Sequence, residues 1–247
     1  DRVTFDGLNT GGDSLTIRNL STTSTANSGA TISFATDSSN NTIQNLTIEG
    51  AHTSTTSGVV FIGGGTVSSV TGNDNNLITN NVIRDRSDAA GIPTILIYSA
   101  SVSATVLNSN NTISNNTLKN FTSTAIVTTQ PATENWTISG NSIFEETQRT
   151  TGLIGINFTA SGTNTITQNT IRDLNTSLTV TGIQLGDARN TTVSRNHIHS
   201  IPSTSGSIST LQGINSSGSS DGLRSVSAMS RCGSTTQACC STRARAP

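Results

Sequence analysis

Aromatic residues, charged residues and proline are all scarce in this sequence. Of its 247 residues, 3% are aromatic, 11% are charged and 4 are proline, and the formal net charge is −1. The composition excludes a coiled coil or a helical bundle, because both are rich in Ala, Glu, Lys and Leu. It also argues against a disordered linker, because disorder usually comes with a high net charge or many prolines.

Long apolar runs are missing as well. The longest run, around residues 59–62, has the length of one strand, whereas a membrane-spanning helix needs ~20 apolar residues. We therefore expect no membrane span. Residues 1–220 hold 9 basic and 13 acidic side chains, a net charge of −4, and few aromatic rings that could stack on bases. We therefore expect no nucleic-acid partner.

What the sequence does contain is an internal repeat. A block of the type Asn-Thr-Ile-Xaa-Asn-Asn-Thr-Ile occurs six times, at residues 41–48, 76–83, 111–118, 136–143, 164–171 and 191–198. In each block two branched apolar residues, the anchors, stand five positions apart. A weaker seventh copy starts at Leu15, with Ile17 as its first anchor and Leu20 at its end.

The five-residue spacing predicts two short strands joined by a tight corner. A single strand needs an even spacing to keep both anchors on one face, and a helix prefers three or four. The corner pairs, such as Asn80-Asn81 and Gly140-Asn141, consist mostly of residues that tolerate a left-handed backbone. Stacked coils would place the second corner residues in one hydrogen-bonded column. The predicted column consists of Asn81, Asn116, Asn141, Asn169 and Asn196. It starts at Asn81 because leucines, Leu20 and Leu46, are expected at the second corner position of the earlier coils.

A third short apolar strand lies between successive blocks, as in Ile156-Asn157-Phe158 and Ile183-Gln184-Leu185. Alternation at period two indicates that one face of this strand is buried. Each repeat is 25 to 35 residues long. The sequence therefore predicts an all-β fold, a right-handed single-stranded parallel β-helix over residues 1–217, with about seven coils and three short strands per coil.

These blocks, followed by a Gly-Ile strand, resemble the parallel β-helix repeats of the pectin-lyase-like superfamily, including those of NosD-like and related carbohydrate-associated exported proteins. The resemblance implies the fold but not one activity, because the superfamily includes lyases, hydrolases, adhesins and non-catalytic modules. It further implies an extracellular or cell-surface location. The chain starts without Met or a signal peptide, so we interpret it as a fragment or mature segment, a monomer within a longer chain.

Two surface features are candidate sites. A column one position after the second anchor is mostly basic and would contact an anionic polysaccharide through Arg84, Lys119, Arg172 and His199. The alternative is that these long side chains only solvate an exposed face. One position later, Glu145 and Asp173 would stand on neighbouring coils, where they would act as acid and base or bind Ca²⁺ if the chain were a lyase or hydrolase.

We assign no catalytic residue, metal site or cofactor from the sequence. Carboxylates such as Glu145 and Asp173 more often begin a solvated loop. His197 and His199 share one face of a strand but have no third ligand nearby, so we interpret them as surface histidines. The functional prediction is a non-catalytic module, structural and in contact with polysaccharide. The alternative is a polysaccharide lyase or glycoside hydrolase whose active site lies partly outside this chain.

The repeats stop near residue 217, and the composition changes there. Residues 218–247 hold four Arg and all three Cys of the chain, Cys232, Cys239 and Cys240. Either this is a cysteine-containing tail, or a reading-frame error has replaced the natural continuation, and we favour the second. In both cases we expect a poorly structured tail.

Overall fold

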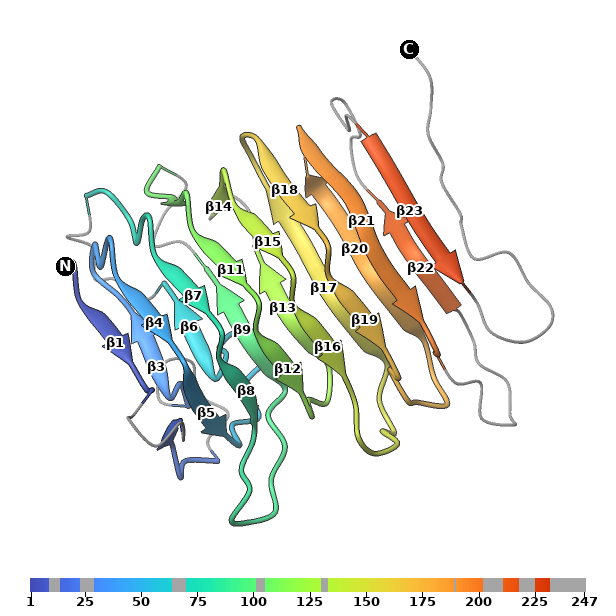
Figure 1. Cartoon of the computed structure of the whole chain (residues 1–247), viewed down its shortest axis with the longest axis horizontal. Helices are drawn as coiled ribbons and strands as arrows, with labels where there is room; N and C mark the ends of the chain where they lie inside the picture. Colours follow the sequence, from blue (N-terminus) through green and yellow to red (C-terminus); the bar gives the residue numbers. More distant parts are fainter. Residues whose placement is uncertain are drawn as a thin grey trace.

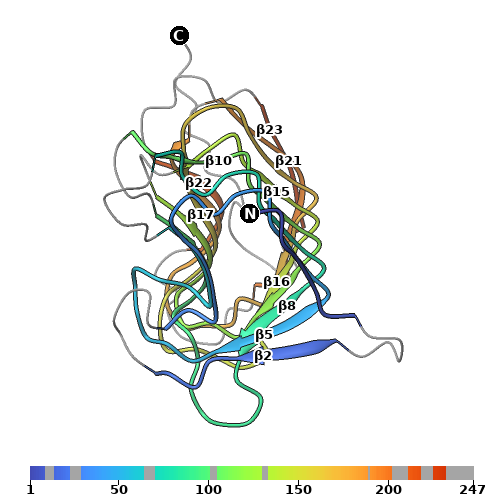
Figure 2. The ribbon, with the colours of Figure 1, turned by 90° about the vertical axis from the view of Figure 1, so that its left-hand side faces the viewer.

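The computed structural model describes residues 1–8, 14–22, 29–63, 70–100, 105–129, 133–188, 190–201, 211–217 and, for the backbone, 225–231. The chain winds repeatedly around one core, and successive coils lie almost over one another when viewed end-on (Figure 2). Every pairing between the named strands is parallel. The described residues contain no helix. The predicted all-β parallel β-helix is confirmed.

A folded sheet of 14 strands forms two sides of each coil. Its first arm consists of β1 (Thr4–Asp6), β4 (Thr42–Gln44), β7 (Leu77–Thr79), β11 (Thr112–Ser114), β15 (Thr137–Ser139), β18 (Asn164–Thr167) and the first half of β21 (Thr191–His199). Its second arm consists of β2 (Leu15–Arg18), β5 (Leu46–Gly50), β8 (Val82–Asp85), β12 (Thr117–Lys119), β16 (Ser142–Phe144), β19 (Thr170–Arg172) and the second half of β21. The arms meet at β21, which crosses the corner as one strand.

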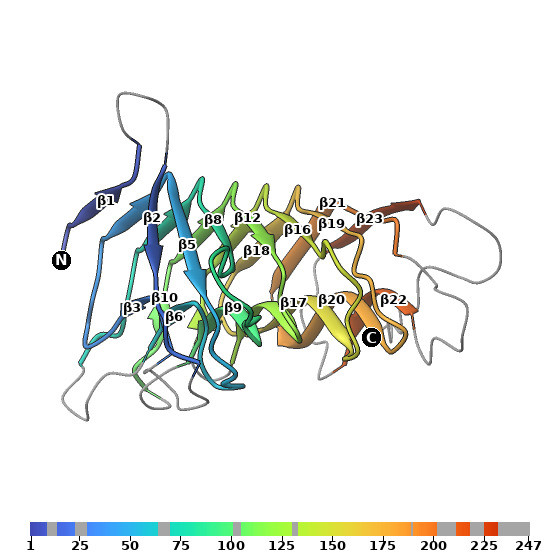
Figure 3. The same cartoon turned by 90° about the horizontal axis from the view of Figure 1, so that it is seen from below.

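The third side of each coil is a sheet of 7 strands, here called the facing sheet. It consists of β3 (Ile32–Phe34), β6 (Val60–Ile62), β9 (Ile95–Ser99), β13 (Thr124–Thr128), β17 (Leu153–Ala160), β20 (Val180–Ala188) and β22 (Leu211–Ser216). A small sheet pairs β10 (Asn108–Ser109) with β14 (Thr133–Glu134). The strands of both large sheets run side by side along the solenoid (Figures 1 and 3).

The anchors of the repeat form the core between the three sides. Ile113 and Ile138 are aligned in the first arm, Leu118 and Ile143 in the second, and all four are fully buried. Ile156 and Ile183 close the core from the facing sheet. Stacked branched side chains fill a narrow interior without many aromatic rings, since each coil repeats the contacts of the last.

The number of coils and the register of the first coil differ from the prediction. The facing sheet contains seven strands, so the chain makes about six turns, where about seven coils were predicted. Ile17 is aligned with the second anchor Ile48, while Phe5 is aligned with the first anchor Ile43. Leu20 is 63% exposed and does not hold the column position. The reason is an insertion, since residues 7–14 separate β1 from β2 where later coils have a tight corner.

The tight corner and its asparagine column are confirmed. The first corner residues have φ between 55° and 67°, and they are Asn80, Asn115, Gly140, Gln168 and Arg195. At Gly140 a Cβ atom would lie very close to Oδ1 of Asn115 in the neighbouring coil, the movable end of that side chain, and residues other than glycine hold the same corner position in the other coils.

The second corner residues form the continuous column, which consists of Asn81, Asn116, Asn141, Asn169 and Asn196. In each step one Oδ1 accepts hydrogen bonds from both the backbone N–H and the Nδ2 of the previous asparagine. Asn141 Oδ1, for example, lies 3.0 Å from both donors of Asn116. Each Nδ2 also donates to the carbonyl of a first anchor, as from Asn141 to Ile113 at 3.0 Å. From Asn81 to Asn169 both amide hydrogens of each side chain are therefore partnered.

A second asparagine column, which the sequence analysis did not predict, lies at the start of the first arm. Asn76 Oδ1 accepts from Asn41, and Asn111 Oδ1 accepts from the N–H of Asn76 at 2.8 Å. In the next coil Trp136 occupies this position, and the column resumes at Asn164, whose Oδ1 accepts from Trp136 N–H at 2.8 Å. We call this the interrupted column.

One strand lies in the segment predicted as a tail. β23 (Ser225–Arg231) pairs with β21 and extends the folded sheet by one strand. Residues 218–224 and 232–247, including the three cysteines, lie outside the described residues. The domain boundary at residue 217 therefore stays a prediction.

Candidate functional site

The predicted basic column lies on the outer face of the second arm. Backbone pairing aligns Glu49 with Arg84, Lys119 with Phe144 and Arg172 with His199. The stacking inferred from the repeat is therefore present. Arg172 also lies over the ring of Phe144, 4.1 Å from its centroid, which is a cation–π contact.

Each cation of this column has an acidic partner beside it. Arg84 Nη2 lies 3.0 Å from Asp85, Lys119 Nζ lies 2.8 Å from Glu146, and Arg172 Nη1 lies 2.5 Å from Asp173. The Asn120 amide donates to both Asp85 and Glu146, which links two of these pairs. Hydrogen bonds from Lys119 and Asn120 hold the pKa of Glu146 below its usual value. The second arm therefore presents a surface of ion pairs, in which each cation of the basic column lies beside a carboxylate.

His199 adds little positive charge at neutral pH. Its ring stacks on that of His197 with centroids 4.1 Å apart, and its Nδ1 lies 2.9 Å from Ser200 Oγ. Partial burial lowers the pKa of His199 below 6.5, and repulsion from His197 is a second, smaller cause of the same shift. The described residues contain no group of three or more His, Cys, Asp or Glu side chains that could hold a metal ion.

Glu145 and Asp173 are neighbours in the backbone, but their side chains separate. The Glu145 N–H donates to the Asp173 carbonyl at 3.3 Å. The Glu145 carboxylate is buried, where it accepts from Phe121 N–H at 2.8 Å and from Arg149 Nε at 2.5 Å. Asp173 instead pairs with Arg172 at the surface. The structure does not bring the two carboxylates together around one reacting bond.

Burial raises the pKa of Glu145 to about 7, although the hydrogen bond from Phe121 and the charge of Arg149 oppose this shift. Glu145 thus connects the coil that contains Phe121 with the turn that leads into β17. Its role here is to satisfy buried polar groups, whereas the sequence interpretation placed it at the start of a solvated loop.

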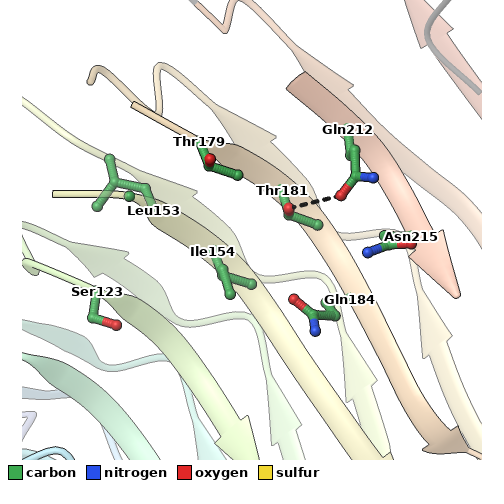
Figure 4. Close-up of a pocket in the computed structure, with 9 residues that line it drawn as sticks. Ser123, Leu153, Ile154, Thr179, Thr181, Gln184, Gln212 and Asn215 are labelled. Carbon is green, nitrogen blue, oxygen red and sulfur yellow. Dashed lines mark hydrogen bonds between the residues drawn. The ribbon is translucent and has the colours of Figure 1, made fainter. Parts of the chain in front are cut away.

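A separate, uncharged groove crosses the outer side of the facing sheet near its C-terminal end (Figure 4). Its volume is about 430 Å³, and it is lined by Ser123, Gly152, Leu153, Ile154, Thr179, Thr181, Gln184, Gln212 and Asn215. Pairing of β17, β20 and β22 aligns Ile154 with Thr181 and Gln212, and Gln184 with Asn215. Thr181 Oγ1 donates to Gln212 Oε1 at 3.3 Å.

The groove presents hydroxyl and amide groups beside two aliphatic residues, Leu153 and Ile154. None of its nine lining residues is charged. Such groups donate and accept hydrogen bonds without a charge preference. This groove was not predicted from the sequence, although the alternation of Ile183 and Leu185 implies that Gln184 faces outward.

The fold and these surfaces define the class of protein, a right-handed parallel β-helix. The chain belongs to the family described as "Right handed beta helix region", whose sequence profile matches residues 70–227. No curated protein matches the sequence. No helix among the described residues is long and apolar enough to cross a membrane.

Among solved structures, the chain is similar to one titled "Structure of the Streptococcus pneumoniae surface protein and adhesin PfbA". The two share 15% sequence identity with a TM-score of 0.42. The match covers 83% of this chain and 64% of that protein, so this chain spans less than two thirds of its length.

Proposed function

We propose that this chain is a non-catalytic extracellular or cell-surface module that contacts polysaccharide. The groove on the facing sheet carries this proposal and favours a neutral polymer. Sugar hydroxyls both donate and accept hydrogen bonds, and amide and hydroxyl side chains complement them in both roles. Ile154 offers an apolar surface for the C–H groups of a sugar ring. The extracellular location rests on the resemblance to exported β-helix repeats.

The groove extends over successive coils, which suits an elongated ligand. Ser123 precedes β13, and the remaining lining residues come from β17, β20, β22 or the residues just before them. Neighbouring parallel strands lie ~4.8 Å apart, close to the length of one sugar ring. A polymer aligned with the solenoid axis would meet uncharged residues from each coil in turn.

An anionic polysaccharide on the basic column is the second candidate. Arg84, Lys119 and Arg172 are aligned on one face, which favours it. Each cation would, however, have to leave its acidic neighbour to bind a ligand. The third candidate is a lyase or hydrolase completed by residues outside this chain.

The test is retention of the chain on immobilised neutral and anionic polysaccharides, with release of oligosaccharides measured in the same samples. We expect retention on a neutral polymer that salt does not weaken, because uncharged contacts are not screened. Gln184→Ala combined with Asn215→Ala should abolish retention. Gln44→Ala, which removes an amide from the first arm, is the matched control and should bind normally.

Other results would point elsewhere. Retention only on anionic polymers, weakened by salt and by Arg172→Ala, would favour the basic column. Release of oligosaccharides would favour the enzyme. Retention that survives both groove substitutions would contradict the groove.

A further inference from the structure

The outer face of the first arm differs from the other surfaces of the solenoid. In each of its strands the middle residue points into the core and the two flanking residues point outward, as Ile113 lies between Thr112 and Ser114. Backbone pairing aligns these outward residues in two columns from β4 to β21. We call this surface the hydroxyl face.

Ten of the twelve residues on this face carry a hydroxyl group. The first column contains Thr42, Leu77, Thr112, Thr137, Thr165 and Thr192, and the second contains Gln44, Thr79, Ser114, Ser139, Thr167 and Ser194. None of the twelve is charged, and all but Thr79 are partly exposed. Seven are threonine, which presents a methyl group beside its hydroxyl.

Strand propensity alone does not explain this composition. The second arm is built from the same repeat, and its outward residues include Glu49, Arg84, Lys119 and Arg172. Both arms need residues that suit a strand, and threonine does so in either arm. From β4 to β21 the outer face of the first arm therefore carries no charged residue, although Asp6 on β1 lies beside Gln44 at its end, whereas charged residues occur along the outer face of the second arm.

The hydroxyl face is also regular in two directions. Parallel strands are ~4.8 Å apart, and residues on the same face of one strand are ~6.6 Å apart. The continuous column holds neighbouring coils in register at the corner beside this face. Hydrogen bonds between Ser114 and Thr79 at 3.0 Å and between Thr167 and Ser194 at 3.1 Å restrict the side-chain rotamers. Both hydrogen bonds join neighbouring coils, so they help to keep the array of hydroxyl groups regular.

We propose that the hydroxyl face binds the surface of ice. Water molecules at an ice surface form a regular lattice, one repeat of which is close to the spacing between neighbouring strands of this face. Hydroxyl groups replace lattice water as donors and acceptors, and the threonine methyl groups fit between them. Charged groups would instead hold a hydration shell of their own that does not match the lattice. A crystalline polysaccharide is the less suitable solid, because these twelve residues include no aromatic ring to stack on sugars.

The test is the partition of the fluorescently labelled full chain into a slowly growing ice hemisphere. We expect enrichment in the ice relative to an inert soluble protein of similar size. Thr112→Lys introduces a long charged side chain near the middle of the hydroxyl face, and enrichment should fall to the level of the inert protein. Thr117→Lys is the matched control, because Thr117 has the equivalent position in the second arm of the same coil. This control should partition like the unmodified chain.

Circular dichroism and thermal melting establish that both variants keep the β-helix. Exclusion of the unmodified chain from ice would overturn the proposal, and so would an equal loss in the two variants. Retention on microcrystalline cellulose or chitin that Thr112→Lys abolishes, without entry into ice, would assign the face to a polysaccharide instead. The Gln184→Ala and Asn215→Ala variants should enter ice normally, so this test and that of the polysaccharide groove fail independently.

Discussion

The two asparagine columns both link neighbouring coils through buried hydrogen bonds, but they do so in different ways. In the continuous column each asparagine from Asn81 to Asn169 donates from Nδ2 to Oδ1 of the asparagine in the next coil, always with the same geometry. In the interrupted column Trp136 replaces one amide, is 1% exposed, and donates from Nε1 to the Asn108 carbonyl at 2.7 Å. A column position can therefore be filled by a side chain that lacks the amide oxygen, provided that it fills the space and its own N–H finds an acceptor.

The largest effect should come from Trp136→Ala, which removes a buried ring from the interrupted column. We expect a loss of about 3–5 kcal/mol in the free energy of unfolding, measured by urea denaturation, because a cavity replaces the ring. Trp136→Asn would restore the amide but not the volume, so it should also destabilise the protein. An Asn variant as stable as the unmodified protein would show that hydrogen bonding, not packing, decides this position.

Asn141→Ala compared with Asn111→Ala separates the two columns directly. The first change leaves both donors of Asn116 and the Ile113 carbonyl without partners. The second leaves only Asn76 N–H and the Asn73 carbonyl. Each unsatisfied buried group costs about 1–3 kcal/mol, so Asn141→Ala should lower the urea midpoint further. Equal midpoints would mean that the extra amide hydrogen bonds of the continuous column contribute nothing.

Glu145 makes the stability of the fold depend on pH, which the neutral amides of the two columns do not. Its pKa is raised from 4.5 to about 7, so the folded protein binds a proton that the unfolded chain releases. This contribution to stability is complete below pH 4.5 and is lost as the pH rises through 7. The decrease in urea midpoint from pH 5 to pH 8 should therefore shrink in Glu145→Gln. Glu146→Gln changes the exposed neighbour of Glu145, and this variant should show the same decrease in urea midpoint as the unmodified protein.

His52 has the opposite effect on the pH dependence of stability, so it also contributes to the change in urea midpoint between pH 5 and pH 8. It is buried, its Nε2 donates to the Ile95 carbonyl at 3.1 Å, and burial lowers its pKa below 6.5. Its contribution is present above pH 6.5 and is lost as the pH falls. Both Glu variants retain His52, so the difference between them isolates Glu145.

The smallest effect should come from the paired charges on the second arm. Lys119→Ala removes an ion pair with Glu146, whose side chain is 45% exposed. Exposed ion pairs contribute about 0–1 kcal/mol, and salt screens them. The thermal midpoint should change little, and still less at high salt. A loss comparable to that of Asn141→Ala would indicate that the network through Asn120 acts as a unit.

The features that repeat at constant spacing could be predicted from the sequence. The anchors and the corner recur in all six blocks and the continuous column in the last five, and physical constraints allow few residues at these positions. The interrupted column escaped prediction because Trp136 breaks its pattern. The misplaced first coil has a similar cause, since the insertion between β1 and β2 hides the register of Ile17.

The surfaces were harder to predict because neighbouring coils build them. Periodicity placed Arg84, Lys119 and Arg172 in one column, but it did not show that Asp85, Glu146 and Asp173 turn toward them. The groove combines residues from four coils, and no single repeat carries its signature. Only the stacking of coils brings Ser123, Gln184 and Asn215 to one surface.

The direction of the backbone hydrogen bonds gives the solenoid a distinct mechanical character. These bonds join coil to coil and thus run along the long axis, so tension between the two ends loads the stacked coils in series. One coil can then detach while the rest stay folded. The coil between Asn116 and Asn141 contains 25 residues, and once extended it would release about 85 Å of chain. Under tension, such a stack would lengthen in steps and limit the force passed to whatever it is attached to.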